Sequence, residues 1–234
     1  GVSQEKMRPL ESQYPIHFGA LGLRETYIKC GNLEQGRSKT ETIIVANISS
    51  SPLQLDFKDI SENLDIQVSP NPVPAKSTAE ISFTVNSDKD KWGKNNYWAT
   101  PVLNGRVISE NGKIRKLGVW AFTKENFDDL SESEISKGSM PRFASSTFNF
   151  GKVPVGTEIH ATFKLKNEGK SCFCVHKVDV DACCYSHSDI PVADPGEEIT
   201  FRVHLDTKDM HAGECLKIVT LTTNSPLRPI VNLF

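Results

Sequence analysis

The segment that decides the fold is Gly31-Asn32-Leu33-Glu34-Gln35-Gly36, which is followed by an alternating apolar run and then by Asn47. The same plan recurs in the second half of the chain as Gly151-Lys152-Val153-Pro154-Val155-Gly156, an alternating run and Asn167. Later positions correspond as well, because Ile81-Ser82-Phe83 matches Ile199-Thr200-Phe201. Self-similarity of this kind indicates two copies of one structural module.

In both copies, apolar residues alternate with polar ones over short segments, a pattern typical of half-buried β-strands. Turn-forming residues separate these segments at intervals of roughly 8–12 residues, and no long helical pattern interrupts them. We therefore predict an all-β protein built of two tandem immunoglobulin-like antiparallel β-sandwiches, joined by an acidic linker. Each module needs two packed sheets because a single sheet would leave its apolar face exposed.

The predicted organisation has four parts. An N-terminal segment, residues 1–26, precedes the first sandwich at 27–125, and a linker at 126–142 precedes the second sandwich at 143–234. We expect one edge strand in the N-terminal segment, where Pro15 is tolerated. The linker is acidic and rich in serine, and an Asp or Ser cap is expected to start one short helical turn within it.

Composition excludes several classes of function. The chain has 234 residues, of which 38% are hydrophobic and 24% charged, as in ordinary globular proteins. Its net charge of -2 gives no bulk attraction to nucleic acid or to an anionic membrane. No apolar run approaches the roughly 18 residues that span a bilayer, so we predict no transmembrane segment. Because the first residue is Gly, we expect that a preceding segment such as a signal peptide has been removed.

Several motifs in residues 143–234 carry a resemblance to a known family. They are Phe148-Asn149-Phe150-Gly151-Lys152-Val153, Gly156, the run from Phe163 to Gly169, Asp194-Pro195-Gly196 and Thr223-Asn224-Ser225-Pro226. The second copy thereby resembles a family of exported bacterial modules of unknown function, related in fold to hydin and abnormal-spindle type immunoglobulin-like domains. The resemblance implies a protein without assigned activity, located outside the cytoplasm of a Gram-negative bacterium: periplasmic, secreted or surface-anchored. Family members usually carry a Cys-Gly-Cys triplet, where this chain has Ala182-Cys183-Cys184-Tyr185.

Cysteine and histidine residues concentrate in the second module. Since Phe173 and Val175 should face the core, strand alternation places Cys172, Cys174 and His176 on the opposite face. Cys30 of the first module occupies the apolar position that Phe150 has in the second, so we expect it to be a buried, inert thiol.

One set of these residues could bind a metal or take part in thiol redox chemistry. Its members are Cys172, Cys174, His176, Cys183, Cys184 and His187. Thiolates and imidazoles suit a soft or borderline metal such as zinc or Cu(I), although the spacing differs from that of two separated cysteine pairs. Thiol redox chemistry is a further alternative. Structural disulfides or inert thiols are the favoured interpretation, so we predict no cofactor.

A second candidate ligand surface lies in the most aromatic stretch of the first module, which contains Trp92, Tyr97 and Trp98 among several lysines. Aromatic side chains interleaved with basic ones can stack on a sugar or on single-stranded nucleic acid. More often such a cluster simply covers one side of a hairpin. No nucleic-acid-binding motif accompanies it, so we predict that the protein does not bind nucleic acid.

The sequence contains no catalytic signature: it lacks a nucleophile elbow, a phosphate-binding loop and a zinc-protease helix motif. His160 and His204 alternate with core residues and are expected to be solvated. We therefore predict a non-enzymatic exported protein that acts in protein binding or assembly, for instance by accepting a partner strand at an exposed sheet edge. The alternative is a metal-binding or thiol-redox protein. An enzyme site between the modules has no motif in its favour.

Overall fold

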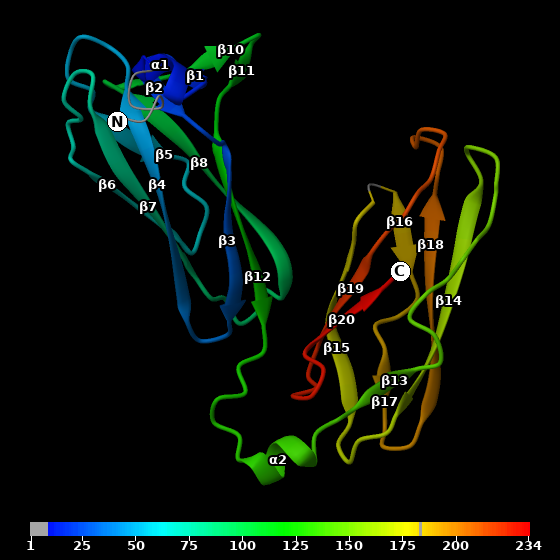
Figure 1. Ribbon diagram of the computed structural model, residues 1–234. Coiled ribbons are helices and arrows are strands. Elements are labelled where there is room, and N and C mark those ends of the chain that lie inside the picture. The colour runs from blue at the N-terminus through cyan, green and yellow to red at the C-terminus, as the bar shows by residue number, and fades with distance from the viewer. Residues whose placement is uncertain (1–8, 183) are drawn as a thin grey trace, which may run out of the picture. The chain divides into compact units, whose positions relative to one another are not determined.

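The computed structural model describes residues 9–182 and 184–234, and it consists almost entirely of antiparallel strands (Figure 1). The chain divides into two compact units, the first ending at Thr123 and the second comprising Lys124–Phe234. Each unit encloses its own hydrophobic core. The predicted fold class, a tandem of all-β sandwiches, is confirmed.

Unit 1 contains two principal sheets. The first has the order β1-β2-β4-β7-β6, with β1 at Ile16–Phe18, β2 at Leu21–Leu23, β4 at Ser38–Asn47, β7 at Thr78–Asn86 and β6 at Leu64–Ser69. The second has the order β3-β12-β8-β5, with β3 at Tyr27–Glu34, β12 at Leu117–Lys124, β8 at Gly93–Leu103 and β5 at Leu55–Lys58. Smaller elements are α1 at Leu10–Gln13, β9 at Arg106–Val107, β10 at Ser109–Glu110 and β11 at Lys113–Ile114.

The core of unit 1 follows from strand alternation. Along β7 the buried residues are Ala79, Ile81, Phe83 and Val85, every second position of the strand. Cys30 is 3% exposed and packs in the same core, as its correspondence with Phe150 predicts.

The N-terminal segment is more structured than the single edge strand that the sequence indicates. Strands β1 and β2 form a hairpin in which Ile16 lies opposite Leu23, and β2 extends the sheet by pairing with β4. Gly19 adopts a φ of 59°, a conformation that favours glycine, and so permits the tight turn between them. Phe18 and Leu21 are fully buried, so this segment contributes to the first sandwich.

Unit 2 repeats the plan with fewer strands. One sheet has the order β13-β14-β18-β16, with β13 at Pro141–Phe143, β14 at Glu158–Asn167, β18 at Glu198–Asp206 and β16 at Tyr185–His187. The other has the order β17-β15-β19-β20, with β17 at Val192–Ala193, β15 at Phe173–Val180, β19 at Val219–Thr223 and β20 at Ile230–Leu233. Cys215 lies outside β19, in the segment that follows Gly213, which has a φ of 137°.

The predicted helical turn of the linker is α2, Glu132–Ser136. Its N-cap is Ser131, whose hydroxyl accepts a hydrogen bond from the Glu134 backbone while the Glu134 carboxylate bonds back to the cap. The residues after α2 are attached to unit 2, since the Ser225 hydroxyl donates to the Ser139 carbonyl and Ser139 is buried. Neither helix of the described chain has the length and apolarity needed to cross a membrane.

A buried asparagine at the end of one strand ties each sandwich together. In unit 1 the Asn47 Nδ2 donates to the carbonyls of Ser51 at 2.8 Å and Val73 at 3.0 Å. In unit 2 the Asn167 Nδ2 donates to the carbonyls of Ser171 at 2.8 Å and Ala193 at 2.9 Å. Both asparagines are fully buried, and each partner stands at the same sequence offset in the two copies. The repeated motif therefore encodes one hydrogen-bond network.

Replacing either asparagine should destabilise its own unit selectively. Loss of the amide leaves several buried backbone groups unpaired, so we expect Asn47→Ala and Asn167→Ala to lower the free energy of unfolding by about 2–4 kcal/mol. All three tryptophans, Trp92, Trp98 and Trp120, belong to unit 1. Tryptophan fluorescence during urea unfolding should therefore shift only in Asn47→Ala, while far-UV circular dichroism detects both losses.

The matched control is Asn232→Ala, because Asn232 is exposed on β20 and its amide accepts a single hydrogen bond from Thr220. It should change the unfolding midpoint little. An equal shift of the tryptophan transition in Asn47→Ala and Asn167→Ala would contradict separate stabilisation of the two units.

Candidate functional site

The outer face of the β3-β12-β8-β5 sheet carries a cluster of aromatic and basic side chains. Its members, here called the aromatic–lysine face, are Tyr27 and Lys29 on β3, Trp120 on β12, and Lys94, Asn96 and Trp98 on β8. They share a face because the intervening residues, such as Ile28, Tyr97 and Val119, are buried in the core. Strands β3, β12 and β8 lie side by side in Figure 1.

The side chains of this face are ordered by mutual contacts. The Tyr27 and Trp98 rings stack with centroids 6.1 Å apart and planes 27° from parallel, and the Tyr27 hydroxyl donates to Oδ1 of Asn96. The Lys94 ammonium lies 5.1 Å from the centroid of the Trp120 ring, and that of Lys29 lies 5.7 Å from the same ring. These are cation–π distances. Even so, Trp98 is 44% exposed and Tyr27 39% exposed.

Gly118 forms the floor beneath two of the rings. It lies opposite Trp98 in the β12–β8 register. A Cβ atom at this position would come within 2.7 Å of Cζ3 of Trp98 and 2.8 Å of Cδ2 of Tyr27. The close stacking of both rings over the backbone therefore requires glycine here.

The three aromatic residues that the sequence nominates as a ligand surface do not lie together on one face. Of Trp92, Tyr97 and Trp98, only Trp98 belongs to the aromatic–lysine face. Tyr97 is 1% exposed, and burial raises the pKa of its hydroxyl, with a smaller contribution from Asp88. Neighbouring residues of a strand point to opposite faces, so Tyr97 and Trp98 cannot share one surface.

Sequence reasoning missed Tyr27 and Trp120 because they come from strands distant in sequence. A signal for Tyr27 was present. Since Cys30 was expected to be buried, strand alternation places Tyr27 and Lys29 on the opposite, outer face.

The structure distributes the predicted cysteine and histidine set over both sheets of unit 2. Cys172 is exposed, while Cys174 and His176 lie partly buried on β15, on the face opposite Phe173 and Val175 as predicted. His176 Nε2 is 2.9 Å from Oε2 of Glu125. Cys184 and His187 belong to the β16 region of the other sheet.

Among the described residues, the one group of three or more His, Cys, Asp or Glu whose ligand atoms lie within 4.8 Å of one another contains no member of this set, so its described members do not surround one point. The His187 Nδ1 donates to the Ser188 carbonyl at 2.6 Å. Cys183 lies outside the described residues. The assignment of a zinc or copper site to the whole set stays a prediction.

Among the described residues, the thiols of Cys30 and Cys174 have an environment that suppresses ionisation. Burial raises the pKa of Cys174, and the nearby Glu125 and Cys172 add to the effect. Burial also raises the pKa of Cys30, with a further increase from Glu41 that Lys39 partly opposes. Both environments disfavour the thiolate, the form that acts as nucleophile and metal ligand.

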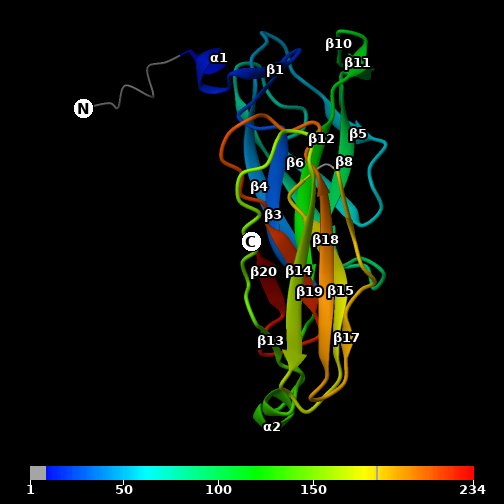
Figure 2. The same ribbon diagram turned by 90° about the vertical axis from the view of Figure 1, so that its right-hand side faces the viewer.

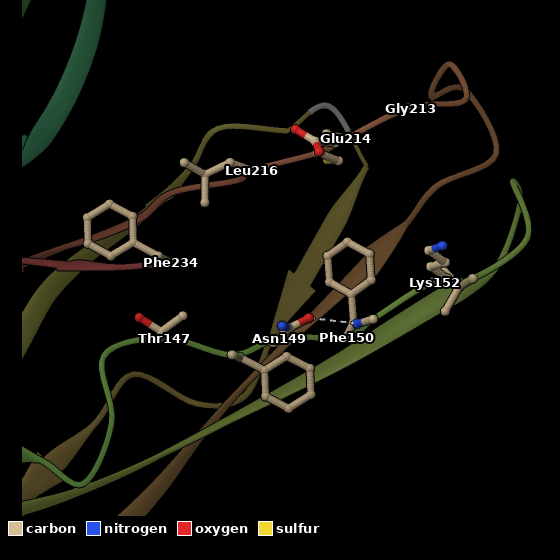
Figure 3. A pocket seen from close by; sticks show the side chains of 12 residues that line it. Thr147, Asn149, Phe150, Lys152, Gly213, Glu214, Leu216 and Phe234 are labelled. Atoms are coloured by element: carbon tan, nitrogen blue, oxygen red, sulfur yellow. Dashed lines mark hydrogen bonds between the residues drawn. The ribbon is translucent and has the colours of Figure 1, made fainter.

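A groove of about 980 Å³ opens in unit 2 between residues 147–153 and residues 213–216. Figure 3 shows that Phe150, Leu216 and Phe234 line it, and that Lys152 and Glu214 come from different walls. At one end of the groove, residues 147–153 are joined to the C-terminal residue by a hydrogen bond from the Phe148 N–H to the Phe234 carbonyl at 2.7 Å. The residues that line the groove include no histidine. The single lysine and the single glutamate of the lining come from separate walls, so they form no converging acid–base pair.

Residues 141–233 match the model of a family described as Protein of unknown function (DUF1573). This agrees with the resemblance of the second copy to bacterial modules of unknown function, and no catalytic family is indicated. The relation to hydin-type domains and the Cys-Gly-Cys triplet stay predictions. Comparison with curated proteins finds no match.

Among solved structures, a protein of unknown function from Porphyromonas gingivalis W83 is similar with a TM-score of 0.70 and 14% identity, over 92% of this chain and 97% of that chain. This likeness shows a shared fold. The E. coli chaperone DraB matches with a TM-score of 0.29 and 11% identity, over 88% of this chain and 93% of that chain. The titin tandem immunoglobulin domains A164-A165 match with a TM-score of 0.28 and 9% identity, over 91% of this chain and 93% of that chain.

Thiol alkylation should follow the environments of the cysteines. Cys172 and Cys215 are exposed, whereas Cys30 is buried and Cys174 is partly buried with a raised pKa. We expect iodoacetamide at neutral pH to modify Cys172 and Cys215 well before Cys174 and Cys30, because alkylation requires an accessible thiolate. Peptide mass spectrometry over a time course measures the order. Faster modification of Cys174 than of Cys172 would contradict it, and labelling in denaturant provides the control for equal intrinsic reactivity.

Proposed function

We propose that this protein is a non-catalytic binding or assembly protein that acts outside the cytoplasm. In this proposal, the aromatic–lysine face of unit 1 holds an acidic segment of a partner protein. The observation that carries the proposal is the exposed stacked pair Tyr27 and Trp98 with Lys94 and Lys29 placed over neighbouring rings.

The composition of the face supports a protein partner. Tyrosine and tryptophan are enriched in the buried centres of protein interfaces, where a few such side chains provide most of the binding energy. Here three large aromatic side chains lie close together on a rigid sheet, and contacts among them already restrict their rotamers. The side chains of this face therefore lose less conformational entropy when a partner binds than mobile side chains would.

The charges of the face support an acidic partner. The six residues of the aromatic–lysine face include two lysines and no carboxylate, although the whole chain has a net charge of -2. A carboxylate on the partner could pair with Lys29 or Lys94 while apolar groups cover Trp98. Such complementarity favours one class of partner and speeds association.

The non-catalytic and extracytoplasmic parts of the proposal have separate support. The titratable groups of the face are one tyrosine and two lysines, without a nucleophile held beside a base. The location rests on the resemblance of the second unit to exported bacterial modules.

Selection of short random peptides on the intact chain tests the proposed binding. We expect enrichment of peptides that combine Asp or Glu with apolar residues. Truncating a central aromatic side chain costs about 2 kcal/mol or more, so Trp98→Ala should weaken the binding of these peptides about thirtyfold or more. Lys94→Glu should also weaken it. The matched control is Lys113→Glu, a charge reversal on the exposed strand β11. If the peptides bound Trp98→Ala and Lys94→Glu with the same affinity as the original chain, the proposal would be overturned.

Gly118→Ala provides an independent probe of the same face. The added methyl group would displace the ends of the Trp98 and Tyr27 rings, which are side-chain atoms and can move. We expect altered tryptophan emission and weaker peptide binding, with the far-UV circular dichroism unchanged. The variant Gly31→Ala is no suitable control because Gly31 has a φ of 86°, whereas Ala99→Gly, inside the core, controls for stability alone. Unchanged emission in Gly118→Ala would contradict the stacking.

A further inference from the structure

A group of potential metal ligands lies on the outer face of unit 2, apart from the cysteine and histidine set considered above. Glu158 and His160 stand two residues apart on β14, and His204 stands on the neighbouring strand β18. His160 and His204 are direct cross-strand partners. Figures 1 and 2 both show β14 beside β18. The sheet therefore brings two imidazoles and a carboxylate to one place.

The distances within the group are short. The two imidazole centroids are 4.3 Å apart, with planes 73° from parallel. Oε1 of Glu158 is 3.8 Å from Nε2 of His160 and 3.7 Å from Nδ1 of His204, and one ligand atom from each residue lies within 4.8 Å of the others. Zinc binds imidazole nitrogen at about 2.0–2.1 Å in tetrahedral sites, which sets ligand atoms about 3.3 Å apart. Small rotations of these exposed side chains would bring the ligand atoms from the observed separations to those of a zinc site.

We propose that Glu158, His160 and His204 form a binding site for a first-row divalent metal ion, with Zn²⁺ as the representative ion and water completing its coordination. Two imidazole nitrogens and one carboxylate oxygen are a donor set that suits zinc and its neighbours in the first transition row. The site does not suit calcium or magnesium, which prefer oxygen donors throughout.

The surroundings leave room for a bound ion and for water. A hollow of about 250 Å³ adjoins the group, and its lining adds Cys184, Tyr185, Ser186 and Asp206 to Glu158 and His204. Asp206 is the register partner of Glu158, so two carboxylates lie on one side of the histidine pair. On the other side, Arg202 lies two cross-strand pairs from the histidine pair, which is about 7 Å along the strand. Lys208, 4.0 Å from Asp206, partly neutralises the second carboxylate.

The pairing of His160 with His204 is informative because folding does not require histidine at either position: an outward strand position accepts nearly any polar side chain. Two histidines directly opposite each other repel when both are protonated, as like charges across a sheet do. Metal binding uses the neutral imidazoles and converts this unfavourable pair into two ligands of one ion. Glu158 then supplies negative charge from the same face.

Zinc titration of the intact chain by isothermal calorimetry tests the site, after removal of any resident metal with a chelator. We expect one Zn²⁺ per chain, with affinity reduced about tenfold or more in each of His160→Asn, His204→Asn and Glu158→Gln. The matched controls are His211→Asn, an exposed histidine of the same unit, and the double variant Cys172→Ser with Cys174→Ser. Both should bind Zn²⁺ like the original chain.

Cobalt(II) distinguishes this site from a thiol site. Bound through nitrogen and oxygen, Co²⁺ should give visible absorption without the charge-transfer bands of a cobalt–thiolate bond. Thiolate bands that vanish in Cys184→Ser would overturn the proposal, as would zinc binding that survives His160→Asn and His204→Asn. Absence of stoichiometric Zn²⁺ binding would overturn it as well. Because the three ligands are surface residues, metal-free unfolding of the variants should match the original chain, and this measurement identifies any variant that merely misfolds.

Discussion

The rest of the structure depends on the burial of one asparagine side chain in each sandwich. Asn47 and Asn167 end their strands inside the core, where an unpaired amide would be costly. Each amide instead fixes the loop that follows and the chain segment that leads to the next long strand. The interaction holds the end of β4 or β14 against these two segments, while the apolar alternation of β4, β7, β14 and β18 sets which of their residues face inward. The outward faces are consequences of that register.

Much of the fold could be predicted because strand alternation is a local signal and the internal repeat is visible in the sequence. The outward position of Cys174 and the capped turn at Ser131 follow from residues within a few positions of one another, and the burial of Cys30 follows from its correspondence with Phe150 in the other copy. The hairpin of β1 and β2 could not, since Gly19 gives only a weak turn signal and the strands gain their stability by pairing with β4. The β1–β2 hairpin therefore depends on a tertiary contact, the pairing of β2 with β4.

The candidate sites were harder to predict because each is assembled across strands. The aromatic–lysine face takes its side chains from three strands, and no sequence window contains them together. His160 and His204 were both expected outside, but their meeting depends on the register between β14 and β18. The cysteine and histidine set shows the converse: residues close in sequence were separated when β15 and β16 entered different sheets.

The two copies share their inward residues and differ in their outward ones, and this division explains how one scaffold can carry two chemistries. Core positions are constrained by packing, since a change of volume there costs stability. Outward positions of a strand lack that constraint, so unit 1 could acquire stacked rings under lysines while unit 2 acquired histidines beside a glutamate. The two faces lie on separate units with separate cores. The proposed peptide binding by the first and the proposed metal binding by the second rest on different residues, so a mutation that removes one set of side chains leaves the other set in place.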